Sequence, residues 1–154
     1  MRCLFSIIMF AAASLRAQEP DCYVDKAFLI AGSHTDYAAA LNQANKVAAG
    51  TGLRLDLRGL KPAKAAGLSF ADSSCVEEFG EAPCYVARGR YDDGVYVSIE
   101  YSSAYEGFRQ GYYIVVAASG EPGSAELRTT QAKVRRIEPT AYVKKSKVYI
   151  CCMH

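Results

Sequence analysis

The residues best suited to chemistry lie at the end of the chain, where Cys151, Cys152 and His154 stand almost together. A thiolate next to a histidine base is the arrangement that cysteine-dependent enzymes use for covalent catalysis. Nothing in the flanking sequence indicates an enclosed pocket, however, and a disulfide bond would consume the thiol. We therefore interpret these residues as structural and not as catalytic.

Two other pairs of neighbours resemble catalytic groups, namely Ser33 with His34 and Glu77 with Glu78. Adjacent side chains at the entry to a helix point in different directions, so Ser33 and His34 read better as a helix cap and a turn residue than as a dyad. Glutamates next to each other on a loop do not make the opposed carboxylates of a glycosidase. The sequence also has no glycine-rich phosphate loop and no Gly-x-Ser-x-Gly elbow. These features predict a protein that is not an enzyme and holds no cofactor.

The first 17 residues have the pattern of a secretory signal peptide. Arg2 supplies the positive charge, residues 4–13 form an apolar stretch, and Ala17 offers a small residue before the cut. The apolar stretch is shorter than the roughly 20 residues that a membrane span needs. An uncleaved anchor is the alternative, but the pattern favours export to the periplasm or the medium, with no stable membrane span after cleavage.

Removing residues 1–17 also changes the charge and the length. The 18 basic residues of the chain become 16, because Arg2 and Arg16 are lost, and they balance 16 acidic residues. A neutral chain argues against general nucleic-acid binding. The remaining residues, 18–154, are enough for one domain but hardly for two.

Five cysteines follow the predicted cut, and in an oxidising compartment they predict disulfide bonds. Cys75 and Cys84 lie in one segment and can close a short ring. Cys22 precedes the first strand, and Cys151 and Cys152 follow the last, so a bridge to either one would join the two ends of the domain. The odd cysteine is left open. A metal site is not expected, because zinc sites need paired cysteines or nearby histidines.

The elements that position these residues begin with a strand, a helix and a second strand within residues 27–57. Residues 27–31 are an uncharged apolar run that indicates a buried strand. Ser33 or Thr35 is placed to cap a helix, with Asp36 in its first turn. Glycines end the helix at residues 50–52, and alternating leucines predict a half-buried strand over residues 53–57.

A second strand, helix and strand follow at residues 112–118, 125–137 and 141–150. Between the two halves, an insertion of about residues 61–110 reads as loop with one short helical turn, followed by a β-hairpin. The hairpin would join residues 85–90 to residues 95–101 through Asp92, Asp93 and Gly94, because Asp-Gly favours a type I′ turn.

This order predicts an α+β fold of the ferredoxin-like βαββαβ type. Right-handed crossovers then give one antiparallel sheet in the order last, first, third and second strand, with both helices on one face. The first and last strands would lie side by side, which brings Cys22 close to Cys151 and Cys152.

The segments LIAGSHTDYAAALNQANKVAAGTGLRL and YIVVAASGEPGSAELRTTQAKVRRIEPTAYVKK resemble the two halves of the SPOR (sporulation-related repeat) domain. The resemblance covers residues 23–60 and 111–150, without the insertion. It implies a non-enzymatic protein of the bacterial cell envelope that binds peptidoglycan glycan strands on the helix-free face of its sheet. Its candidate contacts are Ser33, His34, Arg58 and Tyr112, which border the strand ends or that face.

Two positions depart from the family pattern, because Ile30 and Val115 stand where polar residues often face the glycan. Strands that are apolar on both faces need cover on both. The Cys75–Cys84 loop and the hairpin are the candidates for that cover, and a protein partner is the other. The alternative function is therefore a periplasmic inhibitor or immunity protein that binds a cell-wall-acting enzyme. A sealed face would favour the protein partner, and an open, polar-rimmed groove would favour sugar.

Overall fold

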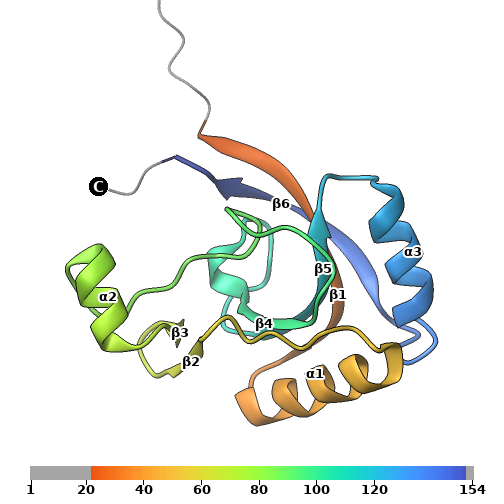
Figure 1. Cartoon of the computed structure of the whole chain (residues 1–154), viewed down its shortest axis with the longest axis horizontal. Helices are drawn as coiled ribbons and strands as arrows, with labels where there is room; N and C mark the ends of the chain where they lie inside the picture. The colour runs from red at the N-terminus through yellow and green to blue at the C-terminus, as the bar shows by residue number, and fades with distance from the viewer. Residues whose placement is uncertain (1–21, 152–154) are drawn as a thin grey trace, which may run out of the picture.

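The apolar run near residue 27 forms the middle of a long strand, β1 (Tyr23–His34). Figure 1 shows the computed structural model, in which residues 22–151 are described. Residues 27–31 are at most 2% exposed, because both faces of β1 are covered. β1 pairs antiparallel with β5 (Tyr113–Gly120) on one side and with β6 (Tyr142–Tyr149) on the other. The predicted signal peptide lies outside the described residues.

Two helices pack on one face of this sheet, as the sequence predicts. Helix α1 (Tyr37–Thr51) and helix α3 (Ala125–Val134) bury their apolar residues in one core with Leu29 and Val115. Asp36 caps α1 by accepting a hydrogen bond from the backbone N–H of Ala39 at 2.9 Å, so the prediction of Ser33 or Thr35 as the cap is wrong. The reason is that β1 continues through His34, which leaves Asp36 as the last extended residue before the helix.

The sheet has four antiparallel strands in the order β4-β5-β1-β6, and its edge differs from the predicted one. The position next to β5 belongs to β4 (Ser98–Tyr101), which comes from the insertion. Residues 53–57 are displaced outward, and there Leu55 makes an isolated parallel bridge to Val97. β4 pairs with β5 over four residue pairs and buries Ser98, Ile99 and Glu100, so the insertion supplies the edge strand.

The predicted hairpin at Asp92-Asp93-Gly94 does not form. Residues 95–101 supply β4, but residues 85–90 form no strand, and Gly94 pairs with Ser119 of β5. The physical reason is the side chain of Arg88, which is fully buried and takes the backbone carbonyl groups of Gly94, Tyr96 and Val116. The segment expected as the first hairpin strand is thus tied to residues 94–96 and to β5 through a side chain and not through a strand ladder.

The rest of the insertion forms a lobe that protrudes from the sheet in Figure 1. We call residues 61–84 the protruding lobe. It contains strand β2 (Lys61–Ala63), strand β3 (Gly67–Ser69) and helix α2 (Asp72–Phe79). A disulfide bond between Cys75 and Cys84 holds α2 against the following segment.

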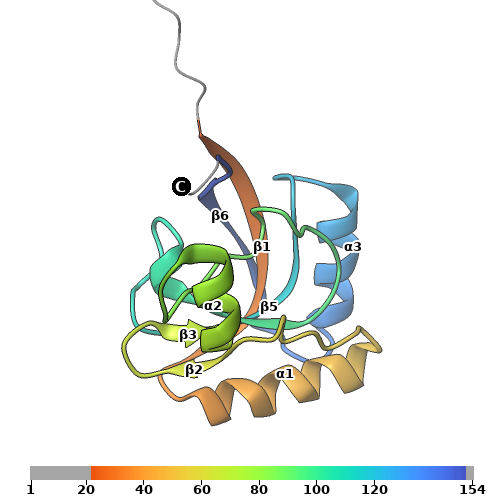
Figure 2. The ribbon, with the colours of Figure 1, turned by 60° about the vertical axis from the view of Figure 1, so that its left-hand side comes forward.

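A second disulfide bond, between Cys22 and Cys151, joins the start of β1 to the end of β6. Figure 2 shows these two strand ends side by side. The structure thus contains a bridge at each place that the cysteine spacing predicts, and it selects Cys151 as the partner of Cys22. Cys152 lies outside the described residues.

The helix-free face of the sheet has its own apolar core, and the insertion covers it. Phe28, Ile30 and Val116 point into this core, where Tyr105 and Phe108 pack on them. The cover that the sequence demands therefore comes from the segment between β4 and β5. Of the two expected covers, the Cys75–Cys84 loop contributes no residue to this core, and the segment of the predicted hairpin contributes only Ala87.

Candidate binding pocket

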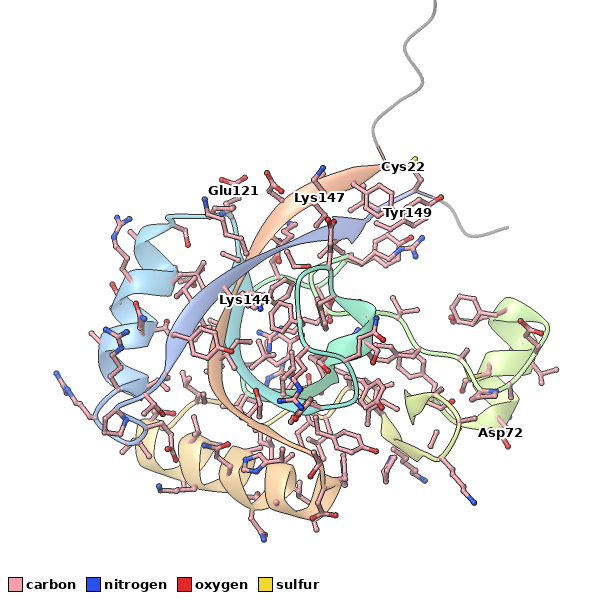
Figure 3. All side chains as sticks on the ribbon, turned by 180° about the vertical axis from the view of Figure 1, so that it is seen from behind. Cys22, Asp72, Glu121, Lys144, Lys147 and Tyr149 are labelled. Atoms are coloured by element: carbon pink, nitrogen blue, oxygen red, sulfur yellow. A yellow bond between two sulfur atoms is a disulfide. The ribbon has the colours of Figure 1, made fainter. Side chains whose placement is uncertain are left out.

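The segment from Ser102 to Tyr112, which we call the cover loop, folds over the helix-free face. Figure 3 shows it in front of the sheet, between β4 and β5. Its two ends are held together, because the backbone N–H of Ser102 donates to the carbonyl of Tyr112 at 2.8 Å and the N–H of Tyr112 donates to Ser102 Oγ at 2.9 Å. Gly107 and Gly111 turn the chain at positive φ, of 76° and 85°.

Tyr105 anchors the cover loop to the sheet. Its ring is 4% exposed and meets the ring of Phe28 edge to face, with the centroids 4.8 Å apart. Its hydroxyl donates to Glu100 Oε2 at 3.3 Å. The loop is therefore fixed by apolar contact and by a hydrogen bond to a charged acceptor.

Glu100 is a carboxylate with no exposed surface, and four side chains satisfy it. Arg58 Nη1 donates at 2.8 Å, the Tyr85 hydroxyl at 2.6 Å and Ser98 Oγ at 2.8 Å, in addition to Tyr105. We call these five residues the Glu100 network. A buried carboxylate persists only when it is paired and fully hydrogen-bonded, and this one is.

The charges of the network shift the pKa values of its members. Burial raises the pKa of Tyr85 and of Tyr105 well above their ordinary value, and the negative charge of Glu100 adds to the rise. Burial alone would lower the pKa of Arg58, but the charges of Glu100 and Asp92 raise it above the ordinary value. Arg58 also pairs with Asp92, with Nε 2.8 Å from Oδ2. The network therefore stays as an ion pair with neutral phenols at physiological pH.

Arg88 joins the insertion to the sheet by a second set of contacts, which meets the Glu100 network at Ser98 and at the Tyr105 hydroxyl. Besides its bonds to carbonyl groups, it donates to Ser98 Oγ at 2.9 Å and to Ser119 Oγ at 3.1 Å. Its guanidinium lies 3.5 Å from the centre of the Tyr96 ring, a cation–π contact. Burial lowers the pKa of Arg88. No ion pair holds Arg88 within residues 22–151, so hydrogen bonds and the ring carry its charge.

Where the cover loop stops, the helix-free face opens into a pocket of about 200 Å³. Residues from β1, β5, β6 and the cover loop meet there. The lining residues are Ser33, Ser102, Phe108, Arg109, Tyr112, Ile114, Tyr142 and Lys144. The floor is Ile114, which is 2% exposed, and three aromatic side chains form walls around it. The pocket thus combines an apolar floor with a polar and cationic rim.

Both cations of the rim are held against aromatic rings. The Arg109 guanidinium lies 5.1 Å from the centre of the Tyr112 ring, and Lys144 Nζ lies 4.3 Å from the centre of the Phe108 ring. Lys144 Nζ also donates to the carbonyl of Gly107 at 2.6 Å. In Figure 3, Lys144 lies along β6, well before Lys147. These contacts restrict two long side chains that would otherwise sample many rotamers.

The structure brings together two of the four candidate contact residues. Ser33 and Tyr112, which are far apart in the sequence, line the same pocket. His34 is turned to α1, where it shares a hydrogen bond of 2.7 Å with Gln43 Oε1. Arg58 belongs to the Glu100 network, and its outer edge lines a different groove with Asp92 and Tyr96.

Sequence reasoning missed Phe108, Arg109, Tyr142 and Lys144. Tyr142 and Lys144 alternate on the last predicted strand, so a period of two places them on one face. This alternation can be seen in the sequence, but the local sequence does not show which face of the sheet Tyr142 and Lys144 occupy. Phe108 and Arg109 lie in an irregular loop, where no periodicity exists to place them.

The other chemistry-bearing groups stay apart. Cys151 is consumed by its disulfide bond, as expected for that thiol, while His154 lies outside the described residues. Glu77 and Glu78 are exposed on α2. Within residues 22–151, no three histidine, cysteine, aspartate or glutamate side chains gather in a metal-binding group. The same part of the chain contains no helix long and apolar enough to cross a membrane.

Comparison of the chain with protein-family models, with curated proteins and with solved structures found no match. The likeness to the SPOR domain therefore rests on the residues quoted for it. The two disulfide bonds are typical of proteins of an oxidising, extracytoplasmic compartment.

Proposed function

We propose that this chain is an exported, non-enzymatic binding protein of the bacterial cell envelope, which holds a sugar of a peptidoglycan glycan strand in the pocket. The observation that carries the proposal is the meeting of Ser33 and Tyr112 in one pocket on the helix-free face. The resemblance to SPOR domains implies glycan binding on that face. In this view the fold is a ferredoxin-like, SPOR-like one in which β4 has entered the sheet edge.

The lining chemistry supports a sugar. Phe108, Tyr112 and Tyr142 offer ring faces and edges to the C–H groups of a pyranose, while Ser33 and Ser102 bring hydroxyls. Ligand sites combine an apolar lining with a few polar groups that fix orientation. The volume is below the roughly 300 Å³ at which sites for larger ligands begin, so the pocket takes a single sugar.

The cover loop restricts the part of the sheet face that a glycan strand can contact. Tyr105 and Phe108 seal the part of the face around Phe28 and Ile30, which removes it as a contact surface. Recognition then depends on the pocket and not on a groove along the whole sheet. This accounts for the apolar residue Ile30, whereas Val115 packs in the core on the helix side of the sheet and does not face the pocket.

The test is a pull-down of the disulfide-bonded domain on purified sacculi, with and without amidase removal of the stem peptides. We expect retention that rises on the denuded glycan and falls with Tyr112→Ala. The matched control is Tyr91→Ala, because Tyr91 is 73% exposed and does not line the pocket. No retention on either form of the sacculi would overturn the proposal.

A second candidate function is inhibition of a cell-wall-acting enzyme through the protruding lobe. The favouring observation is the partial sealing of the sheet face together with Val76, which is 56% exposed on a lobe pinned by its own disulfide bond. Inhibition of a purified cell-wall amidase that is lost in Val76→Asp would support this function. Equal amidase activity with and without the domain would count against it for that enzyme.

A further inference from the structure

The pocket carries positive charge that nothing within the described residues neutralises. Its two cations, Arg109 and Lys144, form no ion pair in residues 22–151. No carboxylate is among the lining residues. The acid next to the cover-loop turn, Glu106, lines a separate hollow with Lys145 and Lys147. Without residues 1–17 the chain would carry equal numbers of basic and acidic residues, so this local excess of positive charge is a property of the pocket.

We infer that the pocket binds a carboxylate carried by its sugar, with Arg109 and Lys144 as the anion-binding residues. The inference rests on the proposed function for the identity of the sugar. Within a cell-wall glycan, the ligand is then the sugar that bears an acidic ether substituent, and not its neutral neighbour.

The arrangement of the cations supports this assignment. Arg109 is stacked on Tyr112 and Lys144 on Phe108, so both heads are placed before the ligand arrives. Lys144 donates one of its three N–H groups to the carbonyl of Gly107, which leaves two for a ligand. The planar guanidinium of Arg109 has a pair of N–H donors whose geometry matches a carboxylate. Cations that are already ordered lose less entropy on binding an anion.

The apolar floor defines the rest of the ligand. Ile114 and the faces of the aromatic rings offer no hydrogen-bond donor to a bare inorganic anion, which would also leave this apolar floor uncovered. An anion attached to a carbon skeleton meets both needs, because its carboxylate reaches the rim while its C–H groups cover the floor and the rings. The chemical class is therefore an amphipathic carboxylate.

The experiment measures binding of four probes to the disulfide-bonded domain by calorimetry. The probes are N-acetylmuramic acid, its uncharged carboxamide, N-acetylglucosamine and lactate. We expect the acid to bind at least about tenfold more tightly than the carboxamide, since hydrogen bonds to charged groups are worth roughly 1.5–3 kcal/mol. The preference should shrink as salt is raised, because exposed charges are screened.

The variant for this test is Arg109→Gln with Lys144→Gln, which keeps donors but removes both charges. It should lose the preference for the acid while still binding the carboxamide. The matched control is Lys145→Gln, the neighbouring lysine of β6 outside the pocket, which should keep the preference. Unchanged disulfides and circular dichroism verify that each variant is folded.

The outcomes separate the two claims. Equal affinity for the acid and the carboxamide overturns the carboxylate inference and leaves the glycan proposal standing. Binding of lactate that depends on Arg109 and Lys144, without binding of either sugar, supports the anion site and overturns the glycan proposal. No binding of any probe to the folded domain overturns both.

Discussion

Glu100 shows at the scale of a residue how this chain keeps a charge inside a small domain. Its carboxylate has no exposed surface and receives four hydrogen bonds, one of them from the Arg58 guanidinium. Replacing both partners of such a pair can be neutral, whereas removing one leaves the other without compensation. Removing Glu100 would leave the Arg58 charge without its partner, and removing Arg58 would leave the Glu100 charge without its partner.

We expect Glu100→Ala to lower the free energy of unfolding by about 3–5 kcal/mol, because Arg58, Tyr85 and Tyr105 lose their common acceptor. Urea unfolding followed by circular dichroism measures the change. The control is Glu121→Ala, an exposed acid without an ion pair in the described residues, which should stay within about 0.5 kcal/mol of the parent. Equal effects of the two substitutions would show that the network does not stabilise the fold.

The raised pKa values of Tyr85 and Tyr105 give a second prediction, for alkaline pH. Above pH about 10 the unfolded chain releases the phenol protons, while the folded chain keeps them. The unfolded state then binds fewer protons, so stability falls as pH rises, by about 1.4 kcal/mol per pH unit for each tyrosine. At neutral pH both states hold these protons, and the two tyrosines add no pH dependence.

Urea unfolding between pH 9 and 11, with the tyrosinate absorbance read in parallel, measures this slope. Tyr85→Phe should make the slope shallower by one tyrosine's share, because phenylalanine has no proton to lose. A slope identical to that of the parent would contradict the buried, neutral phenol at residue 85.

At the scale of elements, the cover loop builds half of the pocket lining, and Tyr105 is its buried aromatic anchor. Four of the eight lining residues come from residues 102–112, and Tyr105 and, less deeply, Phe108 pack into the core of the helix-free face. The loop has no apolar face of its own beyond Tyr105 and Phe108. Its order is thus coupled to the Glu100 network beneath it.

We expect Tyr105→Ala to cost about 3–5 kcal/mol of stability, in the range for truncating a buried aromatic residue, and to free the cover loop. Hydrogen exchange should rise selectively in residues 102–112, and binding to the denuded glycan should be lost. Protection of α1 should persist, since this helix packs on the opposite face of the sheet. Unchanged exchange in the loop would rule out Tyr105 as its anchor.

The same scale shows what local sequence patterns establish and what they miss. The apolar run at residues 27–31 and the glycine after α1 are local signals, and the elements they predict are present. Residues 53–57 and β4 compete for the place beside β5 at the sheet edge. A short stretch of sequence cannot show which segment takes that place. Arg88 reads as a polar residue of an alternating strand, yet it is fully buried, and that burial is why the hairpin prediction fails.

The pocket follows the same division. Ser33 and Tyr112 are predictable because each borders a recognisable strand, and the predicted sheet places their strands side by side. Phe108 and Arg109 reach the pocket from the cover loop, and the path of this loop depends on the contact between Tyr105 and Glu100. Periodicity carries no information about such a contact between side chains.

At the scale of the whole molecule, two disulfide bonds constrain very different lengths of chain. Cys22 and Cys151 are separated by 129 positions, and Cys75 and Cys84 by 9. In the chain-entropy description a bridge stabilises more when it closes a longer loop. In that description the bridge between Cys22 and Cys151 contributes more to the stability than the bridge of the protruding lobe, which closes only a short segment.

We expect Cys22→Ser with Cys151→Ser to cost about 5 kcal/mol, and Cys75→Ser with Cys84→Ser about 3 kcal/mol, in urea unfolding of the oxidised proteins. The second variant should keep its affinity for the glycan, because the lobe supplies no residue of the pocket. A larger loss from the short bridge would contradict this order and would mean that the lobe supports the whole fold.

The central claim is that ligand binding occurs in the pocket on the helix-free face. The most direct measurement is an NMR titration of the isotope-labelled domain with denuded glycan fragments. The account predicts that the backbone amide signals of Ser33, Arg109, Ile114 and Tyr142 shift together with one affinity, while those of α2 stay in place. Shifts confined to the protruding lobe, around Val76, would contradict it and would move the binding function to the insertion.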